Sequence, residues 1–234
     1  MINTSVFQNK KAAYFTLGCK LNFSETSTFG KMLADLGVRI AGEGDVADIC
    51  LVNTCSVTEV ADHKCRQAIH RLVRNNPGAF VIVTGCYAQL ESESVSKIEG
   101  VDLVLGSDEK ANLVQFLSDA WTAKESAAEL NEDGKVESLH EFHSVKTKMI
   151  KSFAPSCSRG NRTRYFLKVQ DGCDYKCAYC TIHYARGGSR NMPIADLVAE
   201  ARQIAAAGPR GIVYIACDPT SLARDTGTLT GLGY

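Results

Sequence analysis

The stretch ADICLVNT, residues 47–54, decides the fold class of the first half of the chain. It is a short, mostly apolar run, which is typical of a buried strand. Residues 59–74 follow it with apolar positions at helical spacing, and the sequence NNPG ends this predicted helix. A buried strand followed by a helix is the repeating unit of a parallel sheet.

The same unit recurs on both sides of this stretch. Three further strand–helix pairs are predicted, at residues 12–18 with 24–36, 79–85 with 91–99, and 101–106 with 109–121. Four such units in succession predict an α/β fold, with a mainly parallel sheet and helices on its faces. We therefore expect an N-terminal domain over residues 1–121.

Three of the four predicted strands end directly in a cysteine, at Cys19, Cys55 and Cys86. The carboxyl ends of parallel strands form one edge of a sheet, and open α/β sheets bind ligands in the crevice beyond that edge. We therefore expect the three thiols to converge on one rim. The alternative for each cysteine taken alone is a small buried core residue. Cys50 and Cys65 are interpreted in that way, because they lie inside a strand and inside a helix.

Composition limits the compartment and the partners. The 234 residues carry 26 basic and 26 acidic side chains, so any site for a polyanion must come from a local patch. There is no signal-peptide pattern and no apolar run of roughly 18 residues, so we expect a cytoplasmic protein without membrane contact. In that reducing compartment, ten cysteines indicate metal binding or catalysis rather than disulfides.

The sequence DGCDYKCAYC, residues 171–180, places Cys173, Cys177 and Cys180 at Cys-x3-Cys-x2-Cys spacing. Structural zinc sites take four protein ligands, often as two Cys-x2-Cys pairs, and no second pair follows here. Three soft thiolates at this spacing instead indicate a [4Fe–4S] cluster that leaves one iron open. The stretch YFLKVQ, residues 165–170, is predicted to be the strand that carries this loop.

Residues 122–163 are predicted to be an interdomain linker with little structure of its own. Between Phe142 and Gln170 there is no acidic residue, and seven basic residues occur: Lys146, Lys148, Lys151, Arg159, Arg162, Arg164 and Lys168. With aromatic residues beside them, these charges suit either a solvated segment or a contact with a phosphate backbone. Cys157, in the same segment, is left unassigned.

The spacing Cys-x3-Cys-x2-Cys, with an aromatic residue before the last cysteine, resembles that of the radical S-adenosylmethionine (SAM) enzymes. The resemblance implies a partial TIM-like barrel, whose first part we expect at residues 164–207. It also implies that Cys173, Cys177 and Cys180 hold a [4Fe–4S] cluster whose open iron binds the methionine part of SAM. Tyr179 either packs on the adenine of that cofactor or is a core aromatic residue.

Four segments narrow the family. They are TLGCKLNFSET (16–26), NTCSVTEVADHKCRQAIHR (53–71), VTGCYAQL (83–90) and FLKVQDGCDYKCAYCTI (166–182). From about residue 12 to 207 the chain resembles the methylthiotransferases, which insert sulfur and a methyl group into an unactivated C–H bond. The resemblance implies that Cys19, Cys55 and Cys86 hold a second [4Fe–4S] cluster.

The stretches TLGCKLN and CRQAIHR most resemble the branch that converts N6-threonylcarbamoyladenosine to its 2-methylthio form. This implies a tRNA methylthiotransferase acting on adenosine 37 of the anticodon loop, with SAM and an electron donor such as flavodoxin or ferredoxin. A ring C–H bond offers no useful acidity for general acid–base catalysis, so radical chemistry from a cofactor is expected. The alternative is an iron–sulfur protein that binds clusters without completing the reaction.

Residues 208–234 depart from the family pattern, and the sequence ends at Tyr234. Residues 209–234, which include GIVYIACDPTS (211–221), resemble instead the C-terminal part of the RNA uracil-5-methyltransferases, with Cys217 at the position of their attacking cysteine. One interpretation is a chimeric reading frame joined near residue 208, and the other is a diverged barrel strand. Because most of the barrel is missing from this sequence, we expect the chain to bind clusters without forming methylthiolated tRNA.

Overall fold

The computed structural model describes residues 5–56, 59–130, 138–158 and 165–206. The chain divides into two compact units, one ending at Pro193 and the other beginning at Ile194, and each is described by itself. The first unit contains a six-stranded sheet and a short two-stranded one. Within the described ranges, no helix is long and apolar enough to cross a membrane.

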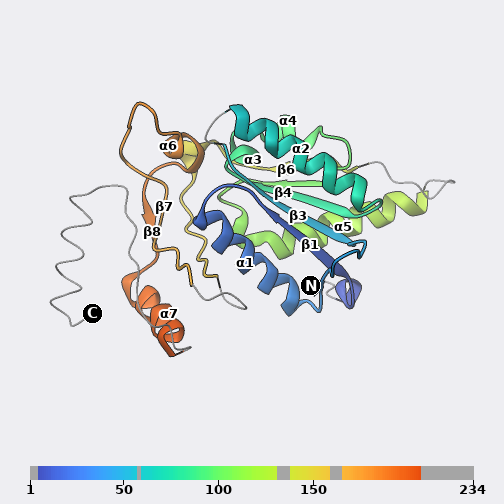
Figure 1. Ribbon diagram of the computed structural model, residues 1–234, viewed down its shortest axis with the longest axis horizontal. Coiled ribbons are helices and arrows are strands. Elements are labelled where there is room, and N and C mark those ends of the chain that lie inside the picture. The colour runs from blue at the N-terminus through green and yellow to red at the C-terminus, as the bar shows by residue number, and fades with distance from the viewer. Residues whose placement is uncertain (1–4, 57–58, 131–137, 159–164, 207–234) are drawn as a thin grey trace. The chain divides into compact units, whose positions relative to one another are not determined.

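The six-stranded sheet is parallel throughout, and its strands lie in the order β2-β1-β3-β4-β5-β6 (Figure 1). The strands are β1 (Lys11–Thr16), β2 (Arg39–Ile40), β3 (Ile49–Thr54), β4 (Phe80–Gly85), β5 (Leu103–Leu105) and β6 (Glu141–His143). Every residue of β3, β4 and β5 is buried. The predicted α/β class with a parallel sheet is confirmed, and the four predicted strands are β1, β3, β4 and β5.

Helices cover both faces of this sheet (Figure 1). The helices are α1 (Lys20–Asp35), α2 (Glu59–Asn75), α3 (Cys86–Leu90), α4 (Ser92–Ser96) and α5 (Leu113–Leu130), with 3₁₀ turns η1 (Ser5–Phe7), η2 (Lys110–Asn112) and η3 (Thr147–Met149). Alternate residues of β3 enter two separate cores: Ile49 and Leu51 pack with α1 and α5, whereas Cys50 and Val52 pack with α2, α3 and α4. The cores are separate because successive side chains of a strand point to opposite faces.

The structure differs from the predicted boundaries in two places of this region. The helix predicted at 91–99 is shortened to α4, and a separate short helix that was not predicted, α3, precedes it and meets it at Glu91. The predicted linker contains the end of α5 and the edge strand β6, which pairs in parallel with β5. The side chains of β6 are half-buried or exposed, so the strand lacks the apolar run that would mark it in the sequence.

The segment after residue 164 is mostly irregular. The strand predicted at 165–170 is reduced to β7 (Gln170–Asp171), which pairs in antiparallel fashion with β8 (Arg190–Asn191). A parallel strand needs a neighbour for its backbone hydrogen bonds, and in the described part of this segment only β8 lies beside β7. The helix α6 (Ile182–Arg186) connects the two strands and contacts α3.

The second unit is described through one helix, α7 (Ile194–Ala206). Asp196 lies in its first turn, where a carboxylate is favourable toward the positive end of the helix dipole. The predicted tail at 208–234, with Cys217, lies outside the described residues.

Candidate functional site

Cys19, Cys55 and Cys86 lie at the carboxyl edge of the parallel sheet. Cys55 directly follows β3, Cys86 directly follows β4 and begins α3, and Cys19 precedes α1 beyond the end of β1. These three strands are neighbours, with β3 paired to β1 on one side and to β4 on the other. The prediction that the three thiols share one rim is therefore confirmed.

This rim includes the topological switch point of the sheet. From β1 the chain runs to β2 at one edge, whereas from β3 it runs to β4 on the other side. The crevice between two strands whose connections diverge in this way is where open α/β sheets bind ligands. Cys19 and Cys55 follow the two strands that flank this crevice.

A glycine brings the first two cysteines together. Gly18 has a backbone φ of +99°, and a Cβ atom at this position would lie 2.7 Å from the Sγ of Cys55. Any other side chain would therefore collide with the Cys55 thiol and would also strain the backbone. Gly85, just before Cys86, has a φ of +103° and leaves no room for a Cβ against the backbone of Thr54.

The three thiols differ in exposure. Cys19 is exposed, whereas Cys55 and Cys86 are buried, and all three are free of disulfides. Burial raises the pKa of the Cys55 thiol to about 11, and the nearby Cys86 and Cys19 add to the rise. The Cys55 thiol therefore resists ionisation until a metal binds and supplies the compensating charge.

Cys65 lies next to this group. It lies in α2 and is fully buried in the core on that face of the sheet, which confirms its predicted place in a core. Its thiol donates a hydrogen bond to the backbone carbonyl of Cys55 at 3.2 Å, a contact that the sequence does not reveal. Burial raises the pKa of the Cys65 thiol, so it remains a protonated donor at neutral pH.

Cys173, Cys177 and Cys180 lie on the loop between β7 and α6. Cys177 is exposed and the other two are half-buried. The Cys173 amide donates to the carbonyl of Gly187 at 3.0 Å, and the Cys180 amide donates to the carbonyl of Cys177 at 3.0 Å. These bonds fold the loop so that its thiols are not covered by a hydrophobic core.

The two cysteine groups are neighbours. The hydroxyl of Thr181, which follows Cys180, donates to the carbonyl of Ser56, which follows Cys55, at 3.1 Å. The helix α6 also contacts α3, which begins with Cys86. Sequence spacing alone does not predict this adjacency, because 125 residues separate the two ends of that hydrogen bond.

Tyr179 is 91% exposed, so the alternative interpretation as a core aromatic residue is wrong. Its ring stands free beside Cys180 on the cysteine loop. An exposed aromatic face next to a binding loop is suited to stacking on a planar ligand such as a purine.

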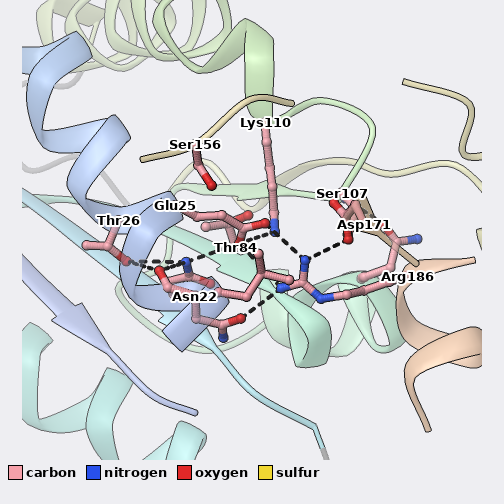
Figure 2. Close-up of polar contacts among 12 residues, drawn as sticks. Asn22, Glu25, Thr26, Thr84, Ser107, Lys110, Ser156, Asp171 and Arg186 are labelled. Carbon is pink, nitrogen blue, oxygen red and sulfur yellow. Dashed lines mark hydrogen bonds and ion pairs between the residues drawn. The ribbon is translucent and has the colours of Figure 1, made fainter. Parts of the chain in front are cut away.

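A buried charge network lies behind the cysteine groups, and sequence reasoning missed it. Figure 2 shows Lys110 and Arg186 converging on Glu25, with Asp171 on the far side of the Arg186 guanidinium. Lys168 completes the network, with its ammonium 3.2 Å from Glu25 and 2.8 Å from Asp171. All five side chains are nearly or fully buried.

The cations decide the ionisation of the two acids. Burial alone would raise the pKa of Glu25, but Arg186, Lys110 and Lys168 together hold it well below its usual range. For Asp171, Arg186 and Lys168 outweigh burial in the same way and lower the pKa to about 2. Both carboxylates are therefore charged at neutral pH.

The network also shows that one cation of the predicted basic stretch is not available for binding a phosphate backbone. Lys168 was counted among the cations available to a phosphate backbone, and this is wrong because it is buried and paired with two carboxylates. Lys146, Lys148 and Lys151 are exposed. The three arginines of the stretch lie outside the described residues.

The cysteines fit clusters better than a single metal ion. In the described parts of the chain, no three His, Cys, Asp or Glu side chains are arranged to hold one metal ion. A [4Fe–4S] cluster makes a different demand, because each thiolate binds a separate iron and the thiols need not converge on one point. Free soft-sulfur donors in two groups of three meet this demand, and in one group the missing side chain of Gly18 leaves room for the Cys55 thiol.

Comparisons with known proteins agree with this arrangement. Residues 11–106 match the family described as "Uncharacterized protein family UPF0004", and residues 167–228 match the "Radical SAM superfamily". The second match runs past residue 208, which supports the interpretation of the following residues as a diverged continuation of the radical SAM region.

Three curated relatives illustrate the similarity. A threonylcarbamoyladenosine tRNA methylthiotransferase of Aquifex aeolicus is 31% identical over 93% of this chain and 50% of its own length. A tRNA-2-methylthio-N(6)-dimethylallyladenosine synthase of Novosphingobium aromaticivorans is 34% identical, over 86% of this chain and 42% of its own length. A ribosomal protein uS12 methylthiotransferase of Chloroflexus aurantiacus is 28% identical, over 93% and 48%. The chain spans about half the length of the curated relatives it matches.

Proposed function

The chain belongs to the radical SAM methylthiotransferase family, and from this membership we propose that it acts in the 2-methylthiolation of N6-threonylcarbamoyladenosine at position 37 of tRNA. The observation that carries the proposal is the adjacency of two three-cysteine groups, joined at Thr181 and Ser56. The assignment to this nucleoside rests on the motifs around Cys19 and Cys65, and on relatives from Aquifex and Bacillus that are named for it.

The two cysteine groups have separate roles in this proposal. Cys173, Cys177 and Cys180 hold a [4Fe–4S] cluster that binds SAM, and Cys19, Cys55 and Cys86 hold a second one. When bound, the cluster at Cys173, Cys177 and Cys180 would supply the electron that cleaves SAM, and the cluster at Cys19, Cys55 and Cys86 would supply the sulfur for transfer.

The chain's own residues prepare the two sites differently. Exposed Cys177 and Tyr179 leave one side of the loop accessible, so that SAM can enter and the ring of Tyr179 can stack on its adenine. Buried Cys55 and Cys86 shield the second site from water. The hydrogen bond from Thr181 to Ser56 holds the sites side by side, which shortens the distance over which reacting groups must be brought together.

The partners of the reaction follow from the same proposal. They are tRNA, bound near the anticodon loop, and an electron donor such as flavodoxin or ferredoxin. Exposed Lys146, Lys148 and Lys151 are the described cations of the basic stretch that suit contact with tRNA phosphates. Since the chain carries no net charge, such a local patch is what an RNA contact requires.

The experiment that tests the function has two readouts. The anaerobically reconstituted protein is reduced with SAM present, and release of 5′-deoxyadenosine is measured. In parallel, tRNA nucleosides are analysed by mass spectrometry in a strain that lacks its own methylthiotransferases and expresses this protein. The proposed function predicts SAM cleavage and the 2-methylthio form of threonylcarbamoyladenosine, and appearance of that nucleoside would overturn the expectation from the sequence that none is formed. Methylthiolated dimethylallyladenosine in its place would reassign the substrate, and clusters without SAM cleavage would favour a cluster-binding protein.

A further inference from the structure

Arg186 is the largest fully buried side chain in the described residues, and it lies at the end of α6. Its Nη1 donates to the carboxylates of Glu25 at 3.0 Å and Asp171 at 2.9 Å. Its Nη2 donates to the side-chain oxygen of Asn22 at 2.8 Å. Nη2 also donates to Glu25 at 3.4 Å, so Arg186 contacts the carboxylates through both nitrogens and Asn22 through one of them.

Asn22 connects Arg186 to the N-terminal cysteines. The Nδ2 of Asn22 donates to the carbonyls of Leu17 at 2.9 Å and Thr54 at 2.8 Å, just before the Gly18–Cys19 turn and just before Cys55. The Cys19 thiol lies 3.7 Å from the same Asn22 oxygen that receives Arg186. A single buried amide therefore links the cation to the backbone or thiol of two of the three cysteines.

The charge of Arg186 also reaches the buried thiols. Asn22 joins the Arg186 guanidinium to the carbonyl of Thr54, the residue before Cys55. The helix α6, which ends at Arg186, also contacts α3, which begins with Cys86. These contacts place the guanidinium close to Cys55 and Cys86.

The buried network has an excess of positive charge. Lys110, Lys168 and Arg186 are three cations, whereas Glu25 and Asp171 are two carboxylates. At the border of the network, Arg190 lies beside Asp171 and the half-buried Asp108. The negative charge of Asp108 offsets that of Arg190, so this pair does not change the net charge. An uncompensated buried charge is costly, and burial lowers the pKa of Lys110 even though Glu25 opposes this change. An anion close by would relieve that cost.

A cluster at the N-terminal cysteines supplies such an anion. Three thiolates on an oxidised [4Fe–4S] core of two positive charges leave one negative charge, which matches the excess of the network. One-electron reduction makes the cluster more negative still. A fixed cation in a low-dielectric environment therefore favours the reduced form over the oxidised one.

We infer that Arg186, supplied by the radical SAM region, is a positioning residue for the N-terminal cluster, whose retention and reduction potential it raises through its charge and its contact with Asn22. This inference rests on the proposed function, because it takes Cys19, Cys55 and Cys86 as the ligands. It makes the properties of one cluster depend on a side chain from the region that holds the other.

The test isolates the N-terminal cluster. In the full chain with Cys173, Cys177 and Cys180 replaced by Ala, the midpoint potential of the remaining cluster is titrated and followed by EPR. Arg186→Gln is expected to shift the midpoint to a more negative value and to weaken retention against a chelator by roughly tenfold or more. Glu25→Gln, which removes a negative charge from the same network, is expected to shift the midpoint in the opposite direction.

Arg190→Gln is the matched control, because it removes an arginine from the same segment that contacts Asp171 and backbone carbonyls. Its midpoint is expected to stay close to that of the parent. An unchanged midpoint in Arg186→Gln, an equal shift in Arg190→Gln, or shifts of one sign in Arg186→Gln and Glu25→Gln would each overturn the inference. Where Arg186→Gln does not fold, the sign of the shift in Glu25→Gln decides. Absence of any cluster in the parent would instead contradict the proposed ligands.

Discussion

The two cysteine groups are held by different kinds of structure. Cys19, Cys55 and Cys86 follow three neighbouring strands of one sheet, so strand pairing fixes the backbone before each of them. The group at 173–180 lies on a loop between a two-residue strand and a five-residue helix. The comparison shows that a shielded, preorganised site and an open site can share one border, which suits a reaction in which one site must exchange its cofactor.

The largest expected effect separates the two groups completely. Replacing Cys19, Cys55 and Cys86 together with Ala is expected to remove one cluster and to leave the other, and replacing Cys173, Cys177 and Cys180 should give the converse, since each group lacks its ligands in turn. Iron and sulfide analysis with EPR measures this. Single replacements of Cys50, Cys65 and Cys157 by Ala are the controls and are expected to keep both clusters. Loss of a cluster in any control would show that the ligands are wrongly assigned.

Alkylation of the metal-free protein compares the thiols directly. Because burial raises the pKa of Cys55 to about 11, its thiolate fraction at pH 8 is about a hundredfold below that of an ordinary cysteine. Exposed Cys177 and Cys19 are expected to react with iodoacetamide before Cys55, and labelling of Cys55 should increase as the pH rises toward 11. Peptide mass spectrometry over a pH series measures both. Equal rates at Cys55 and Cys177 at pH 8 would mean that the N-terminal cysteine site is not shielded.

A pair of glycine variants tests the preorganisation of the N-terminal cysteine site. Gly18→Ala is expected to destabilise the fold by about 1–3 kcal/mol more than Gly44→Ala, because the new Cβ would meet the Cys55 thiol. Gly44 is the matched control, since it also has a positive φ but has nothing within 4 Å of an added Cβ. Thermal and urea unfolding measure the difference. Equal destabilisation would remove the steric argument and leave backbone strain alone.

The smallest expected effect belongs to the open site. Tyr179→Ala is expected to change the free energy of unfolding by less than about 0.5 kcal/mol, because the side chain is exposed. If the ring stacks on adenine, SAM binding should weaken severalfold, by about 1 kcal/mol. Calorimetry with SAM measures this, with Tyr175→Ala, another exposed tyrosine of the loop, as the control. Equal losses in both variants would argue against a specific role for Tyr179.

The N-terminal cysteine site was largely predictable from the sequence. Apolar runs such as 79–85 mark buried strands, and parallel strands bring the residues that follow them to a common edge, so the convergence of Cys55 and Cys86 follows from local pattern. The edge strand β6 was not predictable, because Glu141–His143 has no apolar run. The strand predicted at 165–170 is the opposite case, because it was predicted and is mostly absent from the described structure. There, Lys168 is buried through ion pairs and not through strand alternation.

The contacts that join the two sites could not be read from the sequence. Glu25 and Arg186 are 161 residues apart, and in isolation each is a charged residue of the kind usually found at a surface. Only the folded chain shows that they are buried against each other. An unusual burial of charge has no periodicity, so no pattern in the sequence announces it.

The charge network also has a consequence for biosynthesis. Glu25 and Lys110 leave the ribosome early, whereas Lys168, Asp171 and Arg186 follow only after the whole six-stranded sheet has been translated. Until then the nascent sheet domain has Glu25 without two of its three cations, and the Asn22 side-chain oxygen lacks Arg186. The sheet therefore completes its polar interior last, so a nascent chain arrested before residue 168 leaves this polar interior without its last two cations.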